Sequence, residues 1–226
     1  MSITRTQLPL SVFVGVLAVA GFGVGCGESQ IASNKPKADL SRFDHVGIFV
    51  DGLAPVRMGV MWAYADESGK TITKFVYEEA QAFSEGLAAV KVNDKWGYIN
   101  KSGVYAIEPQ FDSVEEFHEA LASARQEKGG QYGYIDKTGQ FVIQPRYDLT
   151  FSFFDGVGSV KMKDKFGLID RTGKVILPPS YDFIEPFSEG LAAAALNDKW
   201  GFIDKTGRLV IPELCVPAAC GMRAEA

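Results

Sequence analysis

The sequence predicts an all-β protein that consists of five repeated units of about 34 residues. Around each copy of the repeat, apolar side chains alternate with polar ones, which is typical of half-buried strands. No helical periodicity occurs after residue 42. One phrase recurs almost unchanged, NDKWGYINKSG at 93–103 and NDKWGFIDKTG at 197–207, with looser copies at 61–69, 131–139 and 163–173.

The composition is that of a globular protein, with 46% hydrophobic and 23% charged residues among 226. The formal net charge is −5, and basic side chains are interspersed with acidic ones. A nucleic-acid-binding protein usually carries a basic stripe that neutralises phosphates. The charge therefore argues against nucleic acid as a partner.

Residues 1–26 have the pattern of an export signal. Arg5 precedes an apolar run at 8–24, which is expected to form a hydrophobic signal helix slightly short for a bilayer span. The run ends in the letters GVGC, of which the last is Cys26. Small residues before a cysteine resemble the lipobox of bacterial lipoproteins, which implies that Cys26 is lipidated and anchors the protein to a membrane. The alternatives are an ordinary secretory signal with an incidental cysteine and an uncleaved anchor.

The polar residues 27–42 are predicted to form a flexible tether between the anchor and the folded body. In lipoproteins of bacteria with two membranes, an Asp after the lipidated cysteine tends to retain the protein at the inner membrane. Gly27 stands at that position, so the resemblance implies transport to the outer membrane. A secreted protein is expected if the lipobox is not used.

The C-terminal tail, 214–226, comes after the last repeat. Cys215 and Cys220 lie in it at a spacing that a disulfide can close. Export permits such a bridge, and two free thiols in a frayed end are the alternative.

The folded body, 43–213, divides into units that each begin with an aromatic-acidic pair, such as Tyr77-Glu78. The third unit is longer, and its extra residues fall in a turn at 127–131, where a structural repeat tolerates insertion. The expected units are 43–76, 77–110, 111–146, 147–180 and 181–213.

Each unit is predicted to contain about three short antiparallel strands. In the second unit the first strand spans 87–92, and a tight hairpin comes next at 93–94, because Asn and Asp tolerate left-handed backbone angles. The second strand carries the letters WGYI and ends at the turn 100–103, whose closing glycine supplies a positive φ. A third strand at 104–107 is expected to end at Pro109, since proline cannot donate to a β ladder. The corresponding prolines are Pro145, Pro178, Pro179 and Pro212.

The repeated phrase, with FSEGLA upstream and VIxP downstream, resembles the WG-containing (KWG) repeat of bacterial proteins. The resemblance covers about 43–213, and it departs from the pattern at Ala63, where glycine is expected. It implies a β-rich repeat array and no shared catalytic activity, so it assigns no catalytic or cofactor-binding residues. An open, solenoid-like array is favoured, because the degenerate first unit resembles a cap, and a closed propeller-like ring is the alternative. The signature residues are Trp62, Trp96, Gly97, Tyr132, Gly133, Phe166, Gly167, Trp200 and Gly201.

The Trp-Gly pair admits two interpretations. Glycine leaves a gap in the sheet surface that a neighbouring aromatic ring can cover, so Trp96 and Trp200 are expected to pack between units. In the other interpretation the indoles form an exposed platform for sugars or peptides. Large aromatic residues at a fixed register usually lie in a core, and packing is therefore favoured.

Three ladders of acidic residues accompany the repeat. Carboxylate oxygens suit calcium, but each of these lies beside a turn, where Asp and Glu cap backbone groups. No compact calcium-binding loop is present, so we expect capping rather than a metal site. The ladders are Asp44, Glu78, Asp112, Asp148 and Asp182; Asp51, Glu85, Glu119, Asp155 and Glu189; and Asp66, Asn100, Asp136, Asp170 and Asp204.

The expected function is that of a non-enzymatic binding or scaffold lipoprotein of the bacterial cell envelope, which presents a repeated β surface to protein partners and needs no cofactor. A glycan- or cell-wall-binding protein is the first alternative, because the phrase superficially resembles choline-binding repeats. Those repeats have a shorter period and more aromatic residues per unit. An envelope enzyme that uses His118 with Glu115, Glu119 and the loop 127–131 is the remote alternative.

Overall fold

The computed structural model describes residues 39–214. This range contains strands and turns without a helix, so nothing in it forms an apolar helix long enough to cross a membrane. The expected signal helix, most of the tether and all but the first residue of the tail lie outside the described residues. The all-β prediction is confirmed for the part that the structure describes.

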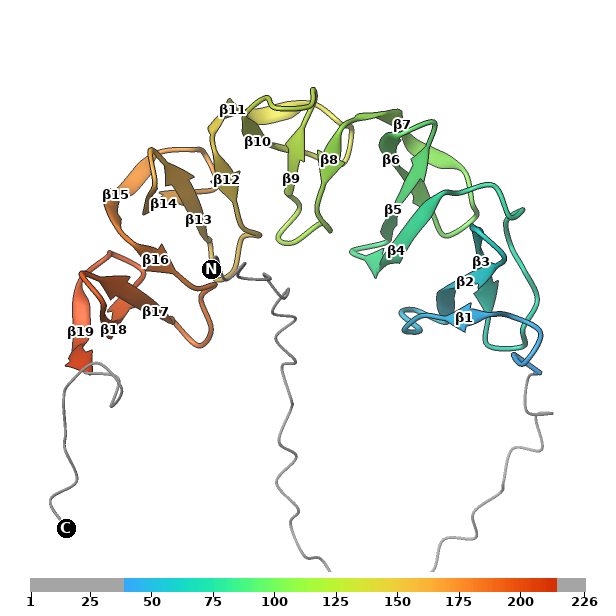
Figure 1. Cartoon of the computed structure of the whole chain (residues 1–226), viewed down its shortest axis with the longest axis horizontal. Coiled ribbons are helices and arrows are strands. Elements are labelled where there is room, and N and C mark those ends of the chain that lie inside the picture. The colour runs from blue at the N-terminus through green and yellow to red at the C-terminus, as the bar shows by residue number, and fades with distance from the viewer. Residues whose placement is uncertain (1–38, 215–226) are drawn as a thin grey trace, which may run out of the picture. The chain divides into compact units, whose positions relative to one another are not determined.

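The strands form five separate antiparallel sheets that succeed one another along the chain (Figure 1). No strand of the first sheet pairs with a strand of the fifth in this range, so no closed sheet forms. The first sheet has three strands, β1 (His45–Val46), β2 (Leu53–Met58) and β3 (Met61–Asp66). The second comprises β4 (Glu79–Ser84), β5 (Leu87–Val92), β6 (Lys95–Asn100) and β7 (Tyr105–Phe111), and the third β8 (Ser113–Val114), β9 (Ala122–Arg125), β10 (Tyr132–Ile135) and β11 (Phe141–Tyr147). The fourth comprises β12 (Leu149–Thr150), β13 (Val157–Met162), β14 (Lys165–Asp170) and β15 (Val175–Tyr181), and the fifth β16 (Phe183–Ile184), β17 (Leu191–Leu196), β18 (Lys199–Asp204) and β19 (Leu209–Leu214).

Each sheet is a meander, and its central hairpin is the one that the sequence predicts. In the second sheet β5 and β6 pair from Leu87 opposite Asn100 to Val92 opposite Lys95. The tip residues Asn93 and Asp94 have φ values of 51° and 60°, as a type I′ turn requires. The first strand of each sheet is an addition that the sequence analysis did not predict. In four of the sheets it has two residues, too few to show alternation.

Proline does not end the last strand of a unit, contrary to the prediction. β7 continues through Pro109 to Phe111, and β11, β15 and β19 likewise run through their prolines. The pairing shifts instead: Tyr98 lies opposite Ile107, whereas Trp96 lies opposite Phe111, so β7 contains a bulge. The strand tolerates proline because it lies at the edge of its sheet, where the missing N–H leaves no ladder partner unpaired.

The hydrophobic core lies between successive sheets. One cluster joins Tyr98 and Phe111 of the second sheet to Val114, Phe117 and Ala124 of the third. The same arrangement recurs between the fourth and fifth sheets, where Leu168 packs with Ile184. A unit therefore buries its faces against its neighbours, as repeat proteins do.

The outer side of the first sheet is covered by residues 39–43, which comprise the end of the predicted tether, 27–42, and the first residue of the first unit. A Cβ built on Gly69 would lie 3.5 Å from Leu40 Cδ2, and Arg42 donates from Nη2 to the Gly69 carbonyl. These contacts replace those that a preceding unit makes elsewhere, so this end of the array is capped. The counterparts in later units are Ile107 against Gly139, Ile143 and Arg146 against Gly173, and Leu177 against Gly207.

Candidate binding surface

The signature aromatic residues lie near the start of the second strand in each central hairpin, within a row that crosses the sheet. In the second sheet this row contains Glu79, Lys91, Trp96 and Phe111, one from each strand. Trp96 is partly buried and packs against the cluster between the second and third sheets. The five rings are Trp62, Trp96, Tyr132 and Trp200, which are partly buried, and Phe166, which is buried.

A cation precedes the ring in the rows of the first four sheets, and in three of them it lies over the ring face. Such contacts contribute about 0.5–1 kcal/mol at exposed sites. Cation and ring centroid are 5.7 Å apart for Arg57 and Trp62, 4.9 Å for Arg125 and Tyr132, and 5.9 Å for Lys161 and Phe166. The fifth row has Ala195 in place of the cation.

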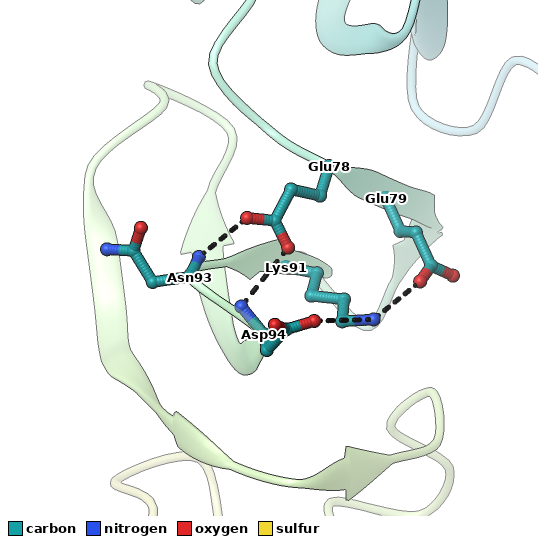
Figure 2. A network of polar contacts seen from close by, with 5 residues as sticks. All are labelled: Glu78, Glu79, Lys91, Asn93 and Asp94. Carbon is teal, nitrogen blue, oxygen red and sulfur yellow. Dashed lines mark hydrogen bonds and ion pairs between the residues drawn. The ribbon is translucent and has the colours of Figure 1, made fainter.

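Acidic neighbours of the same unit engage three of these cations, Lys91, Arg125 and Lys161. Lys91 Nζ lies 2.9 Å from Glu79 Oε1 and 3.7 Å from Asp94 Oδ1, and dashed lines mark both contacts in Figure 2. The hydrogen bond to Glu79 raises the pKa of Lys91. The Glu78 carboxylate accepts hydrogen bonds from the backbone N–H groups of Asn93 and Asp94 at 2.9 and 3.1 Å, so it caps the hairpin tip (Figure 2).

Backbone atoms, not an aromatic ring, lie over the signature glycine. A Cβ on Gly97 would lie 2.5 Å from the Ile107 carbonyl oxygen and 2.6 Å from Pro109 N, because the bulge presses β7 onto β6. The expectation of a covering ring is therefore wrong, and glycine is needed because the edge strand approaches so closely. Gly133 and Gly167 have the same surroundings, and Gly201 is buried.

The first unit lacks this glycine, and its sheet has a different edge. Ala63 stands at this position, and the segment 71–77 forms no continuous fourth strand. It makes isolated bridges, and the Tyr64 N–H donates to the Thr73 hydroxyl at 2.9 Å. The Cβ of Ala63 accounts for the three-stranded sheet, because an edge strand bulged like β7 would collide with it.

The acidic ladders cap turns and tie units together. In the second ladder the carboxylate of one unit accepts the N–H of the equivalent turn in the next unit: Glu85 from Ala120 at 3.0 Å, and Asp155 from Gly190 at 2.9 Å. In the third ladder each Asp accepts N–H groups of its own turn. The Thr206 hydroxyl lowers the pKa of Asp204 to about 2. Among residues 39–214 no group of three or more His, Cys, Asp or Glu side chains could hold a metal ion.

Three buried tyrosines join successive sheets, and the sequence analysis did not predict this role. Burial raises the pKa of each hydroxyl far above the ordinary value. Each hydroxyl donates to a carbonyl of the next unit: Tyr64 to Gln81 at 2.7 Å, Tyr98 to Glu115 at 2.6 Å and Tyr134 to Phe151 at 2.7 Å. The third letter of WGYI was the signal in the sequence. Leu168 and Phe202 stand at this position in the last two units, which indicates an apolar, inward position where a tyrosine hydroxyl needs a buried acceptor.

The proposed catalytic group around His118 is engaged in packing and turn contacts. The His118 ring lies 4.9 Å from the Phe154 ring, and Glu119 accepts the Gly156 N–H at 3.0 Å. Desolvation and the neighbouring Glu116 carboxylate raise the pKa of Glu115, although much of its surface is exposed. No hydrogen bond within the described range joins the His118 side chain to either Glu115 or Glu119.

Exposed apolar side chains recur in the last four units at or just before the start of the last strand, although not at the same register position in each unit. We call this set the last-strand stripe. Its members are exposed by 39–59%, and the sequence analysis predicted a strand here without singling them out. The stripe consists of Val104, Val142, Val175, Leu209, Val210 and Ile211.

The lipidation candidate Cys26 and the two tail cysteines, Cys215 and Cys220, lie outside the described residues. The inserted loop 127–131 is described, and in it the Gly130 N–H donates to the Glu127 carbonyl at 2.9 Å. The insertion is accommodated between β9 and β10 without a change in strand order.

The sequence model of the WG containing repeat matches residues 62–96, 96–129, 132–166, 166–200 and 200–212. The matches cover more than half of the chain. This chain belongs to the WG containing repeat family. Each match begins at the signature aromatic residue, so the first four run from the central hairpin of one sheet to that of the next, and the fifth stays within the fifth sheet.

A comparison with curated proteins found no match. Among solved structures, the chain is similar to virginiamycin B lyase from Staphylococcus aureus, with 19% identity, a TM-score of 0.44, and 76% of this chain and 69% of that chain covered. It is also similar to Kluyveromyces lactis Hsv2p, with 8% identity and a TM-score of 0.46, over 74% of this chain and 63% of that chain. Likenesses this distant do not bear on the function of the WG-repeat chain.

Proposed function

We propose that this WG-repeat protein is a non-enzymatic binding or scaffold protein of the bacterial cell envelope and that it presents the last-strand stripe to protein partners. The supporting observation is the recurrence of exposed apolar side chains at or just before the start of the last strand in four successive units. Exposed apolar patches on soluble proteins commonly mark interaction sites. A repeated stripe suits a partner that contacts several units at once, since the contacts then add up.

The remaining repeated groups are less suited to a ligand. The acidic ladders already accept hydrogen bonds from turns, and ion pairs such as that between Lys137 and Glu85 at 3.1 Å link the units. A sugar platform needs an open ring face, whereas a cation lies over three of the five signature rings. These contacts favour a protein partner at the stripe over a glycan at the Trp-Gly pairs.

The partner can be sought by chemical cross-linking in cells that produce the full chain. We expect the triple variant Val104→Ser, Val142→Ser and Val210→Ser to recover about tenfold less of the cross-linked envelope protein, because three apolar contacts are lost. The matched control changes Ile48, Val60 and Val76 to Ser, which are 77%, 82% and 45% exposed but lie in the first unit, outside the stripe. Equal recovery by both variants, or by the stripe variant and the unaltered chain, would contradict the proposal.

We also propose that the chain is exported and anchored through Cys26, as the apolar run at 8–24 and the small residues before the cysteine suggest. Cells fed labelled palmitate should label the full chain, and Cys26→Ser should remove the label and release the protein from the membrane fraction. Cys220→Ser serves as the control, and this variant should keep both the palmitate label and its place in the membrane fraction. Label that persists in Cys26→Ser would refute lipidation at this residue.

A further inference from the structure

We propose that a pocket between the third and fourth sheets binds one aromatic ring that carries a carboxylate. The pocket has a volume of about 180 Å³. Val160, Met162, Ile169 and Leu177 form its apolar walls. An apolar cavity of about 150 Å³ is known to accept benzene, so this volume suits a single six-membered ring.

The repeat itself indicates what is missing from this pocket. Between the second and third sheets, Phe141 at the start of β11 packs edge-on against Phe111, with ring centroids 6.0 Å apart. Tyr105 holds the corresponding place at the start of β7 and packs with the cluster that contains Tyr77. In both cases the protein's own ring fills the space between neighbouring sheets.

Val175 holds this position at the start of β15, and Tyr147 stands where Phe111 stands one unit earlier. A valine side chain is too short to fill the volume of a phenyl ring. Val175 and Tyr147 both line the pocket that results. The pocket therefore has the size and the surroundings of an absent aromatic side chain.

The positively charged side chain of Arg146 at the pocket is the reason that we propose a ligand with a carboxylate. Arg146 lines the pocket, and its guanidinium is held in place by Nε, which donates to the Tyr147 hydroxyl at 3.0 Å, and by Nη2, which donates to the Gly173 carbonyl at 2.8 Å. No acidic side chain within the described range pairs with Arg146. The remaining N–H groups of an oriented guanidinium suit a carboxylate, and little side-chain freedom is lost on binding.

The test uses the full chain with two probes, phenylacetate and its neutral analogue benzyl alcohol, in an NMR titration that monitors the Met162 methyl signal. We expect saturable shifts with dissociation constants in the millimolar range, as the size of the probes allows. Val175→Phe places a ring in the pocket and should weaken both probes by roughly tenfold or more, while raising the thermal midpoint by filling a cavity. Leu209→Phe introduces the same ring at the equivalent position of the fifth unit and should leave both affinities unchanged.

A second variant, at Arg146, tests the contribution of the charge apart from that of the ring. It also keeps the proposal testable if Val175→Phe does not fold. Arg146→Gln should weaken phenylacetate by roughly fivefold to tenfold and change benzyl alcohol by less than about twofold, because only the charged hydrogen bonds are lost. Absence of a Met162 shift with phenylacetate, or equal weakening of both probes in Arg146→Gln, would overturn the assignment. Unchanged affinity in Val175→Phe would show that the probes bind elsewhere and would also overturn it.

Discussion

Replacement of Gly97 by alanine is expected to destabilise the protein by about 3 kcal/mol, the upper range for overpacking a filled site. The added Cβ would lie 2.5 Å from the Ile107 carbonyl oxygen and 2.6 Å from Pro109 N, and backbone atoms cannot swing aside as a flexible side chain can. The bulged part of β7 must therefore detach from β6. Urea denaturation measures the loss, and amide hydrogen exchange locates it, with protection falling at the β6–β7 ladder and persisting at the β5–β6 hairpin.

Gly156→Ala is the matched control for Gly97→Ala. Gly156 has a φ of 81° and no atom within 4 Å of a built Cβ, so alanine there meets backbone strain without collision. Ala120 already occupies the equivalent position of the third unit with a φ of 65°. We expect a cost of about 1 kcal/mol. A loss in Gly97→Ala no larger than in Gly156→Ala would show that the close approach of the edge strand is not what requires glycine.

Alkaline pH is expected to destabilise the protein through the three buried tyrosines Tyr64, Tyr98 and Tyr134. Burial raises their pKa in the folded state above the value of about 10 in the unfolded chain. Below pH 10 both states keep the protons, and the stabilisation is complete. As the pH rises above 10, the unfolded state loses protons that the folded state keeps, so unfolding becomes more favourable. Each tyrosine then costs about 1.4 kcal/mol by pH 11, or about 4 kcal/mol together, which denaturation curves between pH 8 and 11 will measure.

The slope of stability against pH isolates this effect from general destabilisation. Tyr98→Phe should remove roughly a third of the loss between pH 10 and 11, and it should cost about 1 kcal/mol at pH 7 because the hydrogen bond to the Glu115 carbonyl is lost. Phe153→Leu removes buried volume beside Tyr134 but no titrating group. It should lower stability at every pH and keep the slope. A slope unchanged in Tyr98→Phe would mean that its hydroxyl ionises as readily in the folded protein as in the unfolded chain.

The sequence predicted the features that depend on residues close together in the chain. The hairpin at Asn93-Asp94 was predicted from residues that tolerate positive φ, and the turn of the letters DKTG from an Asp two residues before its bonded N–H. Because the unit repeats, the central hairpin predicted for one unit was also predicted for the sheets of the other four. The WG family was inferred from the same letters and is confirmed by the matches across 62–212.

Features that depend on the neighbouring unit were predicted poorly. The path of β7 through Pro109 depends on its place at the sheet edge, and no local rule for proline shows where an edge will lie. The hydroxyl of Tyr98 finds its acceptor at Glu115, in the next unit, and alternation alone shows only that the ring is inward. The pocket lined by Val175 was missed because a small residue at this position indicates a pocket only by comparison with Phe141. Phe141 holds the equivalent position between the second and third sheets, where its ring fills the space.

The segment 39–43 determines at which end of the array further repeat units can be added. Leu40 and Arg42 make at Gly69 of the first unit the contacts that a last strand makes at the equivalent glycine of the third, fourth and fifth units, so a further unit has no room to dock there. The last strand of the fifth sheet begins with Leu209, Val210 and Ile211, whose side chains are 46%, 52% and 39% exposed. A duplicated repeat would find ready contacts at this end or between any two existing sheets. Evolution or a protein engineer can thus lengthen the array while leaving its first unit, and the distance from that unit to the chain's amino terminus, untouched.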